Sequence, residues 1–514
     1  MLFRSYEVAE NISNFDISPD GKKIGFISRG KVFVSDIEGK FIKQINASDS
    51  ERATEIIWTD NKTLVLSKTL NGYTNFYAIA ADGTGNPKQL TTDTRNNRSI
   101  VYNKKRTMAV FLSGRDKVRL LDLKTLQSKI IAKEDIWGFQ NSTPGFSPND
   151  EYVVFTAYKN FEQDIFIHHI KENKTINLTN TGITEADPIW SADGKYIYFT
   201  SQRLKAAYPF GMPNSHIYRL ALEKIEEPYR IDKFDELFKE EKKDTSKKQA
   251  VKTDSLVKIN IDFDMLMERV QIISPSVGQQ NLLGVYSKAE KTTVLYTSDH
   301  GEGRNAIWKT TLEPFEATKT EKIVSSSSEG YGGVVEANDK LYTILGGNIN
   351  KVNIESNTTT PINISLKFRC NLNEEFNQMF YETWAQMDEN FYDENFHGVD
   401  WIKLKNQYAQ FLPYLNTRAD IRVLLNDLLG ELNSSHQGFN TFGEDEKIVL
   451  RNLTMETGIV FENENPYKIK TIVKRSAADK KAIDIIPGDV LVKVNNETLD
   501  ITKDRNSYFI QSTP

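Results

Sequence analysis

Residues 17–22 of the chain read Ile-Ser-Pro-Asp-Gly-Lys, and an apolar run follows at residues 24–27. Proline restricts φ and glycine accepts positive φ, so this segment predicts a tight reversal of the chain. The apolar run is typical of a β-strand, and a second run follows at residues 32–34 after a turn that contains glycine. We interpret this unit as the junction between strands of a repeated β module.

The unit returns along the chain at roughly the period of a four-stranded propeller blade. Clear copies begin at Trp58, Phe146 and Trp190, a weak copy at Tyr102, and fainter copies near Ser274 and Asn338. Closing strands end in Leu-Thr, as at residues 90–91 and 178–179. Four short strands cannot bury both faces of their sheet, so several units must pack around an axis. The repeats predict a β-propeller of about seven blades over residues 1–366.

One segment of this region, about residues 232–258, breaks the repeat. It is dense in charge and poor in apolar residues, with a run of Lys and Glu at residues 239–243. Such composition is typical of a solvated insertion. We interpret it as an exposed excursion, with a flap over the propeller mouth as the alternative. The blade turn resembles that of TolB-like and tricorn-like propellers, which by itself indicates little about function.

After Cys370 the apolar period becomes helical. One predicted helix carries an apolar face at spacings of three and four, formed by Phe376, Met379, Phe380, Thr383, Trp384 and Met387. A second helix starts near Trp401 and extends to Leu412. A third follows Thr417, which has the spacing of an N-cap with Asp420, and Gly430 fits its end. We expect residues 367–450 to form a helical domain.

This segment carries a specific family resemblance. Its aromatic, glycine and charged positions resemble, in order, the core domain of tricorn proteases: Phe391, Tyr392, Asp393, the run 397–401, Tyr408, Arg418, Asp420, the run 430–432, and Ser434, Ser435 and His436. In that family the closing Ser-His pair belongs to a Ser-His-Ser-Glu tetrad. The resemblance therefore implies that His436 is a general base and that Ser435 is the hydroxyl that supports the tetrad.

The chemistry of histidine agrees with that role. A serine hydroxyl becomes a good nucleophile when a neighbouring base takes its proton, and the pKa of histidine is close to working pH. The alternative for His436 is an ordinary histidine that caps the last carbonyls of a helix. His397 lies in the turn between helices in the resemblance, so we interpret it as structural. No zinc motif and no cofactor motif occur in the sequence.

The last segment, residues 451–514, predicts a small α+β module. Strands are expected at residues 457–461 and 468–473, and a short helix from Ser476. The run 486–497, with its Pro-Gly-Asp turn and Val-Asn-Asn-Glu hairpin, resembles the PDZ domains of processing peptidases. Such domains bind peptides by adding them as a strand to a sheet edge, although an architectural role is equally compatible. We expect this PDZ-like domain to be truncated at residue 514.

Composition limits the possible partners. The chain has 514 residues, 39% hydrophobic and 26% charged, with a net charge of −5 and a single cysteine, Cys370. No basic stripe indicates nucleic acid, no apolar run is long enough for a membrane span, and an internal disulfide is impossible. No signal peptide is visible, so we expect a cytoplasmic protein, while an exported protein without disulfides is also compatible.

The sequence therefore predicts a multidomain, mainly β protein that is part of a tricorn-type serine endopeptidase. The resemblance implies peptide substrates, a homo-oligomer, and a nucleophilic serine beyond residue 514, so we expect this chain alone to be inactive. The alternative is a non-catalytic propeller and PDZ protein that binds peptides. A TolB-like envelope scaffold is a third possibility, and it requires an export signal.

Overall fold

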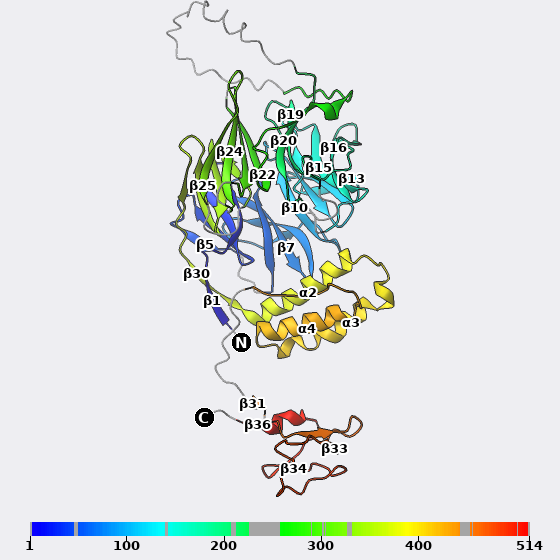
Figure 1. Ribbon diagram of the computed structural model, residues 1–514. Helices are drawn as coiled ribbons and strands as arrows, with labels where there is room; N and C mark the ends of the chain where they lie inside the picture. The colour runs from blue at the N-terminus through cyan, green and yellow to red at the C-terminus, as the bar shows by residue number, and fades with distance from the viewer. Residues whose placement is uncertain are drawn as a thin grey trace, which may run out of the picture. The chain divides into compact units, whose positions relative to one another are not determined.

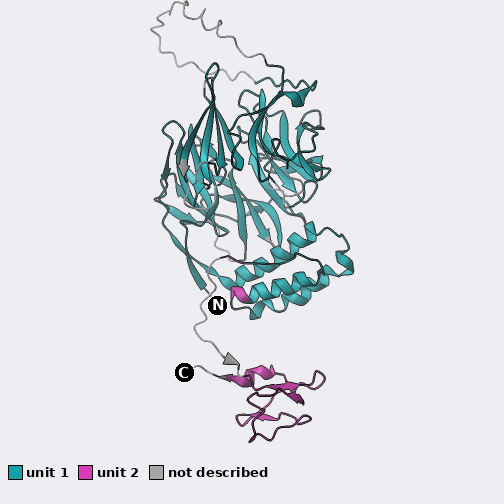
Figure 2. Ribbon diagram, viewed as in Figure 1, with its two compact units in different colours: residues 1–416, 420–440 teal, residues 417–419, 441–514 magenta. Residues whose placement is uncertain are grey.

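The computed structural model describes the following residues: 3–45, 50–138, 142–206, 212–225, 257–288, 290–300, 303, 305–325, 332–442, 453–454, 456–500 and 502–511. They form two compact units, residues 1–416 with 420–440, and residues 417–419 with 441–514 (Figure 2). The predicted charged insertion at 232–258 lies outside the described residues, apart from positions 257 and 258.

Seven four-stranded antiparallel sheets form the first part of the larger unit within the described residues, and each takes four strands in chain order (Figure 1). The strands, sheet by sheet, are β2 Ile12–Ile17, β3 Lys23–Ser28, β4 Lys31–Asp36 and β5 Ile42–Gln44; β6 Arg52–Trp58, β7 Thr63–Leu70, β8 Tyr73–Ala80 and β9 Lys88–Gln89; β10 Asn97–Tyr102, β11 Met108–Ser113, β12 Lys117–Asp122 and β13 Gln127–Lys133; β14 Gly145–Phe146, β15 Tyr152–Lys159, β16 Glu162–His169 and β17 Lys174–Asn177; β18 Glu185–Trp190, β19 Tyr196–Ser201, β20 His216–Ala221 and β21 Val270–Ile272; β22 Gln280–Lys288, β23 Lys291–Ser298, β24 Ala306–Leu312 and β25 Lys319–Ser325; β26 Val335–Ala337, β27 Lys340–Leu345, β28 Asn348–Asn353 and β29 Thr358–Pro361. This arrangement confirms the predicted seven-bladed propeller.

The ring closes because the first and seventh blades share one apolar core. Phe15 and Phe26 of the first blade pack with Tyr342 and Ile344 of the seventh. Outside the blades, β1 (Phe3–Glu7) pairs antiparallel with β30 (Lys367–Asn371), so the start of the chain lies beside the segment that leads into the helices. Because the first and last blades bury apolar side chains against each other, neither blade leaves its apolar face exposed where the ring closes.

The blade turn has a local hydrogen-bond cause. Ser18 donates its hydroxyl to Asp20 Oδ1 at 2.6 Å and accepts the backbone N–H of Lys23 at 3.0 Å, while Gly21 has φ 68°. The same serine-centred contacts form at the copies that contain Ser147 and Ser191. At the weak copy, Asn103 takes over the role, because its side-chain oxygen accepts two backbone N–H groups at 2.8 and 2.9 Å. Short polar side chains thus supply hydrogen-bond acceptors for backbone N–H groups within each of these turns.

One faint copy of the turn was misassigned. Ser274 follows the last strand of the fifth blade, and its hydroxyl accepts the backbone N–H of Ile217 at 3.0 Å. Thr91 and Thr179, which end the Leu-Thr strands, accept equivalent N–H groups at 2.9 and 3.0 Å. The prediction of a blade turn near Ser274 is therefore wrong, because a serine that ends a closing strand resembles one that begins a turn. The other faint copy, residues 338–339, does form the turn between β26 and β27, with both φ angles positive.

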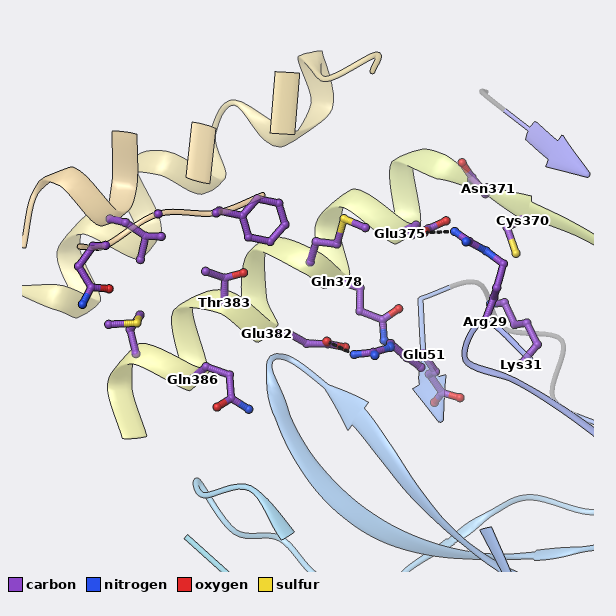
Figure 3. Close-up of a pocket in the computed structure, with 17 residues that line it drawn as sticks. Arg29, Lys31, Glu51, Cys370, Asn371, Glu375, Gln378, Glu382, Thr383 and Gln386 are labelled. Carbon is purple, nitrogen blue, oxygen red and sulfur yellow. Dashed lines mark hydrogen bonds and ion pairs between the residues drawn. The ribbon is translucent and has the colours of Figure 1, made fainter. Parts of the chain in front are cut away.

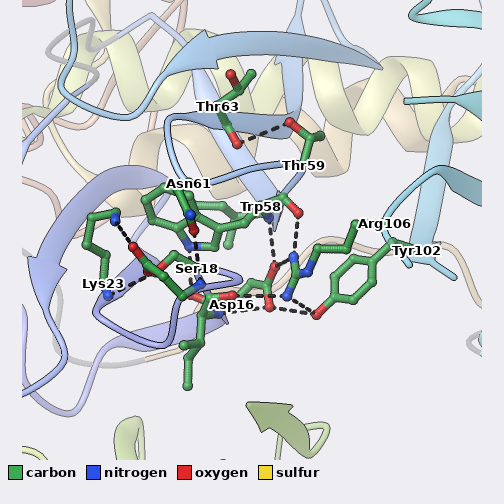
Figure 4. A network of polar contacts seen from close by, with 12 residues as sticks. Asp16, Ser18, Lys23, Trp58, Thr59, Asn61, Thr63, Tyr102 and Arg106 are labelled. Atoms are coloured by element: carbon green, nitrogen blue, oxygen red, sulfur yellow. Dashed lines mark hydrogen bonds and ion pairs between the residues drawn. The ribbon is translucent and has the colours of Figure 1, made fainter. Parts of the chain in front are cut away.

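A buried polar network joins the first three blades (Figure 4). Asp16 of β2 is 2% exposed and accepts the N–H of Trp58 at 2.7 Å, the hydroxyl of Tyr102 at 2.9 Å and Arg106 Nη1 at 3.0 Å. Arg106 also donates to the carbonyls of Trp58 and Ile17 and to Tyr102. Each partner lies on a different blade or on the turn that follows it, so the network ties neighbouring blades together.

The helices of the larger unit follow the propeller. They are α2 (Leu372–Asn390), the short turn η2 (Phe396–Gly398), α3 (Trp401–Ala409), η3 (Leu412–Tyr414) and α4 (Arg418–Gly430), with a 3-10 turn η1 (Leu266–Arg269) near the fifth blade. Phe380 and Trp384 of α2 pack with Leu425 of α4 and with Trp401. The two tryptophans exchange bonds, since each indole N–H donates to the other residue's carbonyl, at 2.9 and 3.2 Å. No described helix is long and apolar enough to cross a membrane.

The second predicted helix is shorter than expected. It ends at Ala409, and Leu412 belongs to η3, which contains Pro413 near its start. Proline lacks the N–H that a continuing helix needs and disfavours helical backbone in the residue before it. The apolar spacing alone gave no sign of this break.

The smaller unit has short strands, namely β31 (Leu453–Thr454), β32 (Ile459–Phe461), β33 (Ile469–Ile472), β34 (Lys493–Val494), β35 (Glu497–Thr498) and β36 (Ile510–Gln511), with the 3-10 turn η4 (Arg505–Phe509). The predicted hairpin forms between β34 and β35, where Asn495 and Asn496 have φ 50° and 68°. The helix expected from Ser476 is wrong, because the segment forms separate turns instead, with the N–H of Asp479 bonded to the carbonyl of Ser476 and that of Ile483 to the carbonyl of Lys480. The PDZ-like assignment stays a prediction.

Candidate functional site

Helix α2 lies against one face of the propeller and crosses its first three blades (Figure 1). Glu375 near its start forms an ion pair with Arg29 at 2.7 Å, and Glu382 in its middle forms one with Arg52 at 2.5 Å. The contacts nearer its end are Tyr73 with Asp388, at 2.5 Å, and the N–H of Asn96 with Glu389, at 2.6 Å. Burial raises the pKa of the Glu389 carboxyl, and its bonds with Asn96 oppose that shift. The helix is thus held on the propeller by polar side chains along one face.

A cavity of about 650 Å³ lies between this helix, the first two blades and the segment after α4 (Figure 3). Apolar side chains of Met379, Met387, Leu429 and Phe439 form part of its wall. The ion pairs of Arg29 and Arg52 lie on its propeller side, so the arginine charges are compensated. The cavity therefore offers apolar walls with a polar, nearly neutral edge.

The segment after α4 leaves the helix through a left-handed residue. Two further turn bonds follow Gly430, and then Asn433 takes φ 47°, a common way to end a helix. The chain then runs back along α4, where Asn426 accepts the N–H of Phe439 and donates to its carbonyl, both at 2.9 Å. We call residues 433–439 the α4 loop.

The structure places both predicted catalytic residues on this loop. Ser435 and His436 are exposed, and His436 has a left-handed backbone, with φ 61°. They directly precede Gln437, Gly438 and Phe439, which line the cavity. Among the described residues neither side chain forms a hydrogen bond, so no serine is bonded to the imidazole of His436. The loop therefore carries an exposed histidine immediately before the residues that line the cavity.

His397 lies elsewhere in the helical region, in the turn η2. Its Nδ1 is 2.8 Å from the carbonyl oxygen of Leu432, and its Nε2 is 2.5 Å from the hydroxyl of Tyr392. Its own N–H donates to Asp393 Oδ2 at 2.8 Å. This histidine contacts the segment just after α4 and is not among the residues that line the cavity.

Sequence reasoning did not identify the polar edge of the cavity. Arg29 and Arg52 lie more than 300 positions before their partners on α2. One signal was present, because Glu375, Gln378 and Glu382 follow each other at spacings of three and four and so share one helix face. Within the described residues, no three histidine, cysteine or acidic side chains lie close enough together to hold a metal ion.

Comparison with protein families gives two matches. The family described as Tricorn protease C1 domain matches residues 372–430, which span α2 to α4, and the TolB beta propeller domain matches residues 104–307. The first match ends before Ser435 and His436, so it does not test their roles.

Individual proteins extend the likeness over most of the chain. A protein of Sulfurisphaera tokodaii described as a tricorn-like protease C-terminal subunit is 20% identical over 505 residues, which covers 93% of this chain and 56% of that protein. The tricorn protease of Thermoplasma acidophilum is 21% identical and covers 82% of this chain and 39% of that protein. The crystal structure of the tricorn protease superposes with a TM-score of 0.63 at 15% identity, covering 98% of this chain and 50% of the other.

The fold and these matches define a propeller protein with a tricorn-type helical region. The predicted resemblance to the tricorn protease family is confirmed. It spans about half the length of the curated relatives that it matches.

Proposed function

We propose that this chain is part of a tricorn-family serine peptidase and that His436 is its general base. The observation that carries this proposal is the α4 loop, which follows the region that resembles the tricorn C1 domain and carries an exposed imidazole immediately before three residues that line the cavity. Ser435 would be the hydroxyl that supports the base. The nucleophilic serine would come from outside these 514 residues.

The exposure of His436 is compatible with a base whose serine partner is supplied from elsewhere. A general base must reach within about 3 Å of the hydroxyl that it deprotonates. A histidine already bonded within its own chain would first have to break that contact, whereas the His436 ring forms no hydrogen bond among the described residues. A serine that approaches the α4 loop could therefore meet a free imidazole nitrogen.

Peptides are the substrates that the cavity best fits. Its apolar walls suit side chains, and the compensated charges at its edge suit the polar backbone of a peptide. A peptide bound there would lie beside the residues that directly follow His436. Assembly into a homo-oligomer belongs to the same proposal, and a cytoplasmic location stays a prediction.

The test is peptidase activity of the protein as its own organism expresses it, beside a His436→Ala variant and a Gln437→Ala control. Loss of a catalytic base lowers kcat by several orders of magnitude. We expect that loss of kcat in His436→Ala alone, because Gln437 lines the proposed peptide cavity and has no chemical role, so Gln437→Ala should change KM at most. Equal activity of His436→Ala and wild type would refute the role of His436. Peptide binding without turnover in any variant would favour the alternative, a peptide-binding propeller protein.

A further inference from the structure

The α4 loop is fastened to the helical region at both of its ends. Before the loop, Leu432 is fully buried in the helical core, and its carbonyl oxygen lies 2.8 Å from Nδ1 of His397. At the far end of the loop, the side-chain amide of Asn426 holds both the N–H and the carbonyl of Phe439. Between these two points the loop carries Ser435 and His436.

The contact with Leu432 defines the tautomer of the neutral His397 ring. A carbonyl oxygen only accepts, so Nδ1 of His397 must carry the proton that it donates. In the neutral ring Nε2 is then an acceptor, which matches the hydroxyl of Tyr392 at 2.5 Å. One tautomer of His397 therefore satisfies both contacts at once.

The backbone around His397 supports the same geometry. His397 has φ 54°, a left-handed conformation that is uncommon for a residue with a side chain. Asp393 stabilises it by accepting the N–H groups of Asn395 and His397 at 3.0 and 2.8 Å. The ring of His397 also packs edge-on against Phe391, with centroids 5.3 Å apart. A local strain that is compensated in this way is typical of a residue that must point in one direction.

We propose that His397 and Asn426 are positioning residues that hold the α4 loop, so that His436 meets its serine partner in a reactive geometry. This inference rests on the proposed function of His436. His397 secures the carbonyl of Leu432, two positions after the end of α4. Asn426 secures the return of the loop along the same helix. Neither residue touches the substrate in this proposal.

Two substitutions of His397 separate its two nitrogens. In His397→Asn the amide nitrogen occupies the place of Nδ1, so the donor to Leu432 is kept, and asparagine also tolerates the left-handed backbone. In His397→Gln the amide lies further out, near the place of Nε2, and the donor to Leu432 is lost. Tyr392→Phe is the matched control, because it removes only the Nε2 contact.

The first readout needs no catalysis. Amide hydrogen exchange of residues 433–439 in the 514-residue chain measures how firmly the loop is held. We expect exchange of the Phe439 amide to rise about fivefold or more in Asn426→Ala, as for the loss of one hydrogen bond. Exchange at Asn433 should rise in His397→Gln and stay near wild type in His397→Asn and Tyr392→Phe. Equal exchange in His397→Gln and His397→Asn would overturn the role of His397.

The second readout is kinetic and uses the protein as its organism expresses it. A displaced base lowers kcat with little effect on KM, and a shift of about 1 Å costs roughly 100-fold. We expect kcat to fall at least tenfold in His397→Gln and Asn426→Ala, with rescue in His397→Asn. Loosened loops with unchanged kcat would overturn the positioning proposal while leaving His436→Ala to decide the proposed function. An active His436→Ala protein would instead overturn both.

Discussion

Removal of the Arg106 guanidinium should destabilise the propeller through one buried carboxylate. Arg106→Leu keeps much of the aliphatic volume but deletes the ion pair with Asp16 at 3.0 Å and the donors to Ile17, Trp58 and Tyr102. Asp16 stays buried and loses its only cationic partner among the described residues. An uncompensated buried charge costs about 3–5 kcal/mol. Because three donors to Asp16 remain, namely Trp58, Tyr102 and the N–H of Ile17, we expect about 3 kcal/mol.

The same variant should depend on pH in a defined direction. Burial raises the pKa of Asp16 above its ordinary 3.8, and Arg106 opposes that shift. Without Arg106 the pKa of Asp16 rises further, so the folded state binds its proton more tightly than the unfolded state. The unfolding free energy then falls as pH rises above the ordinary carboxyl pKa. The loss in Arg106→Leu should thus be smaller near about pH 5 than near about pH 8.

Urea unfolding followed by far-UV circular dichroism measures this loss, and Asp16→Asn with the double variant completes a cycle. If the two residues act as one unit, the double variant loses less than the sum of the single losses by about 1–2 kcal/mol. The reasoning is refuted if the losses add within about 0.5 kcal/mol, or if the loss in Arg106→Leu grows as pH falls.

Three further predictions concern other contacts. Burial raises the pKa of Asp187 to about 6, so its negative charge lowers the free energy of unfolding as pH rises from 3.8 through that value. Asp187→Asn should therefore raise the free energy of unfolding in urea by about 1–2 kcal/mol near pH 8 and leave it unchanged near pH 4, and an equal gain at both pH values would contradict burial as the cause. Trp401→Phe removes the indole N–H that donates to the Trp384 carbonyl and should lower the free energy of unfolding in urea by about 1–2 kcal/mol. An unchanged free energy of unfolding would contradict the importance of this bond. Glu382→Gln keeps an acceptor for the Thr69 hydroxyl and should cost under about 1 kcal/mol by calorimetry, while Glu382→Ala should cost more; equal losses would mean that the bond with Thr69 is unimportant.

The repeated turns were predictable because their cause is local. Ser18, Asp20 and Gly21 lie within four positions, and the side-chain bonds that shape the turn form among Ser18, Asp20 and Lys23. The Asn-Asn hairpin of the smaller unit follows the same rule, since both residues adopt positive φ readily. The wrong blade turn near Ser274 shows the limit, because a hydroxyl can serve a turn or a neighbouring strand, and the strand is far away in the sequence.

The candidate site was predictable only in part. A short pattern placed Ser435 and His436 after a helix, and the structure shows them on an exposed loop there. The same pattern could not show that the next residues line a cavity with Arg29 and Arg52, nor that His397 reaches Leu432. The cavity depends on how α2 lies across the blades, and the contact of His397 depends on how η2 packs against the segment that follows α4.

The sequence by itself determined the elements of this protein: the seven-fold β repeat, the three helical segments and the placement of a serine–histidine pair after the third. These follow from spacing and turn chemistry, which act over a few residues. Only the tertiary structure decided which side chains meet, as in the ion pairs of Glu375 and Glu382 with the propeller and the network of Asp16 with Arg106. The physical reason is that each of these contacts joins groups dozens to hundreds of positions apart, and the packing of blades side by side and of α2 across them brings these groups within hydrogen-bond distance.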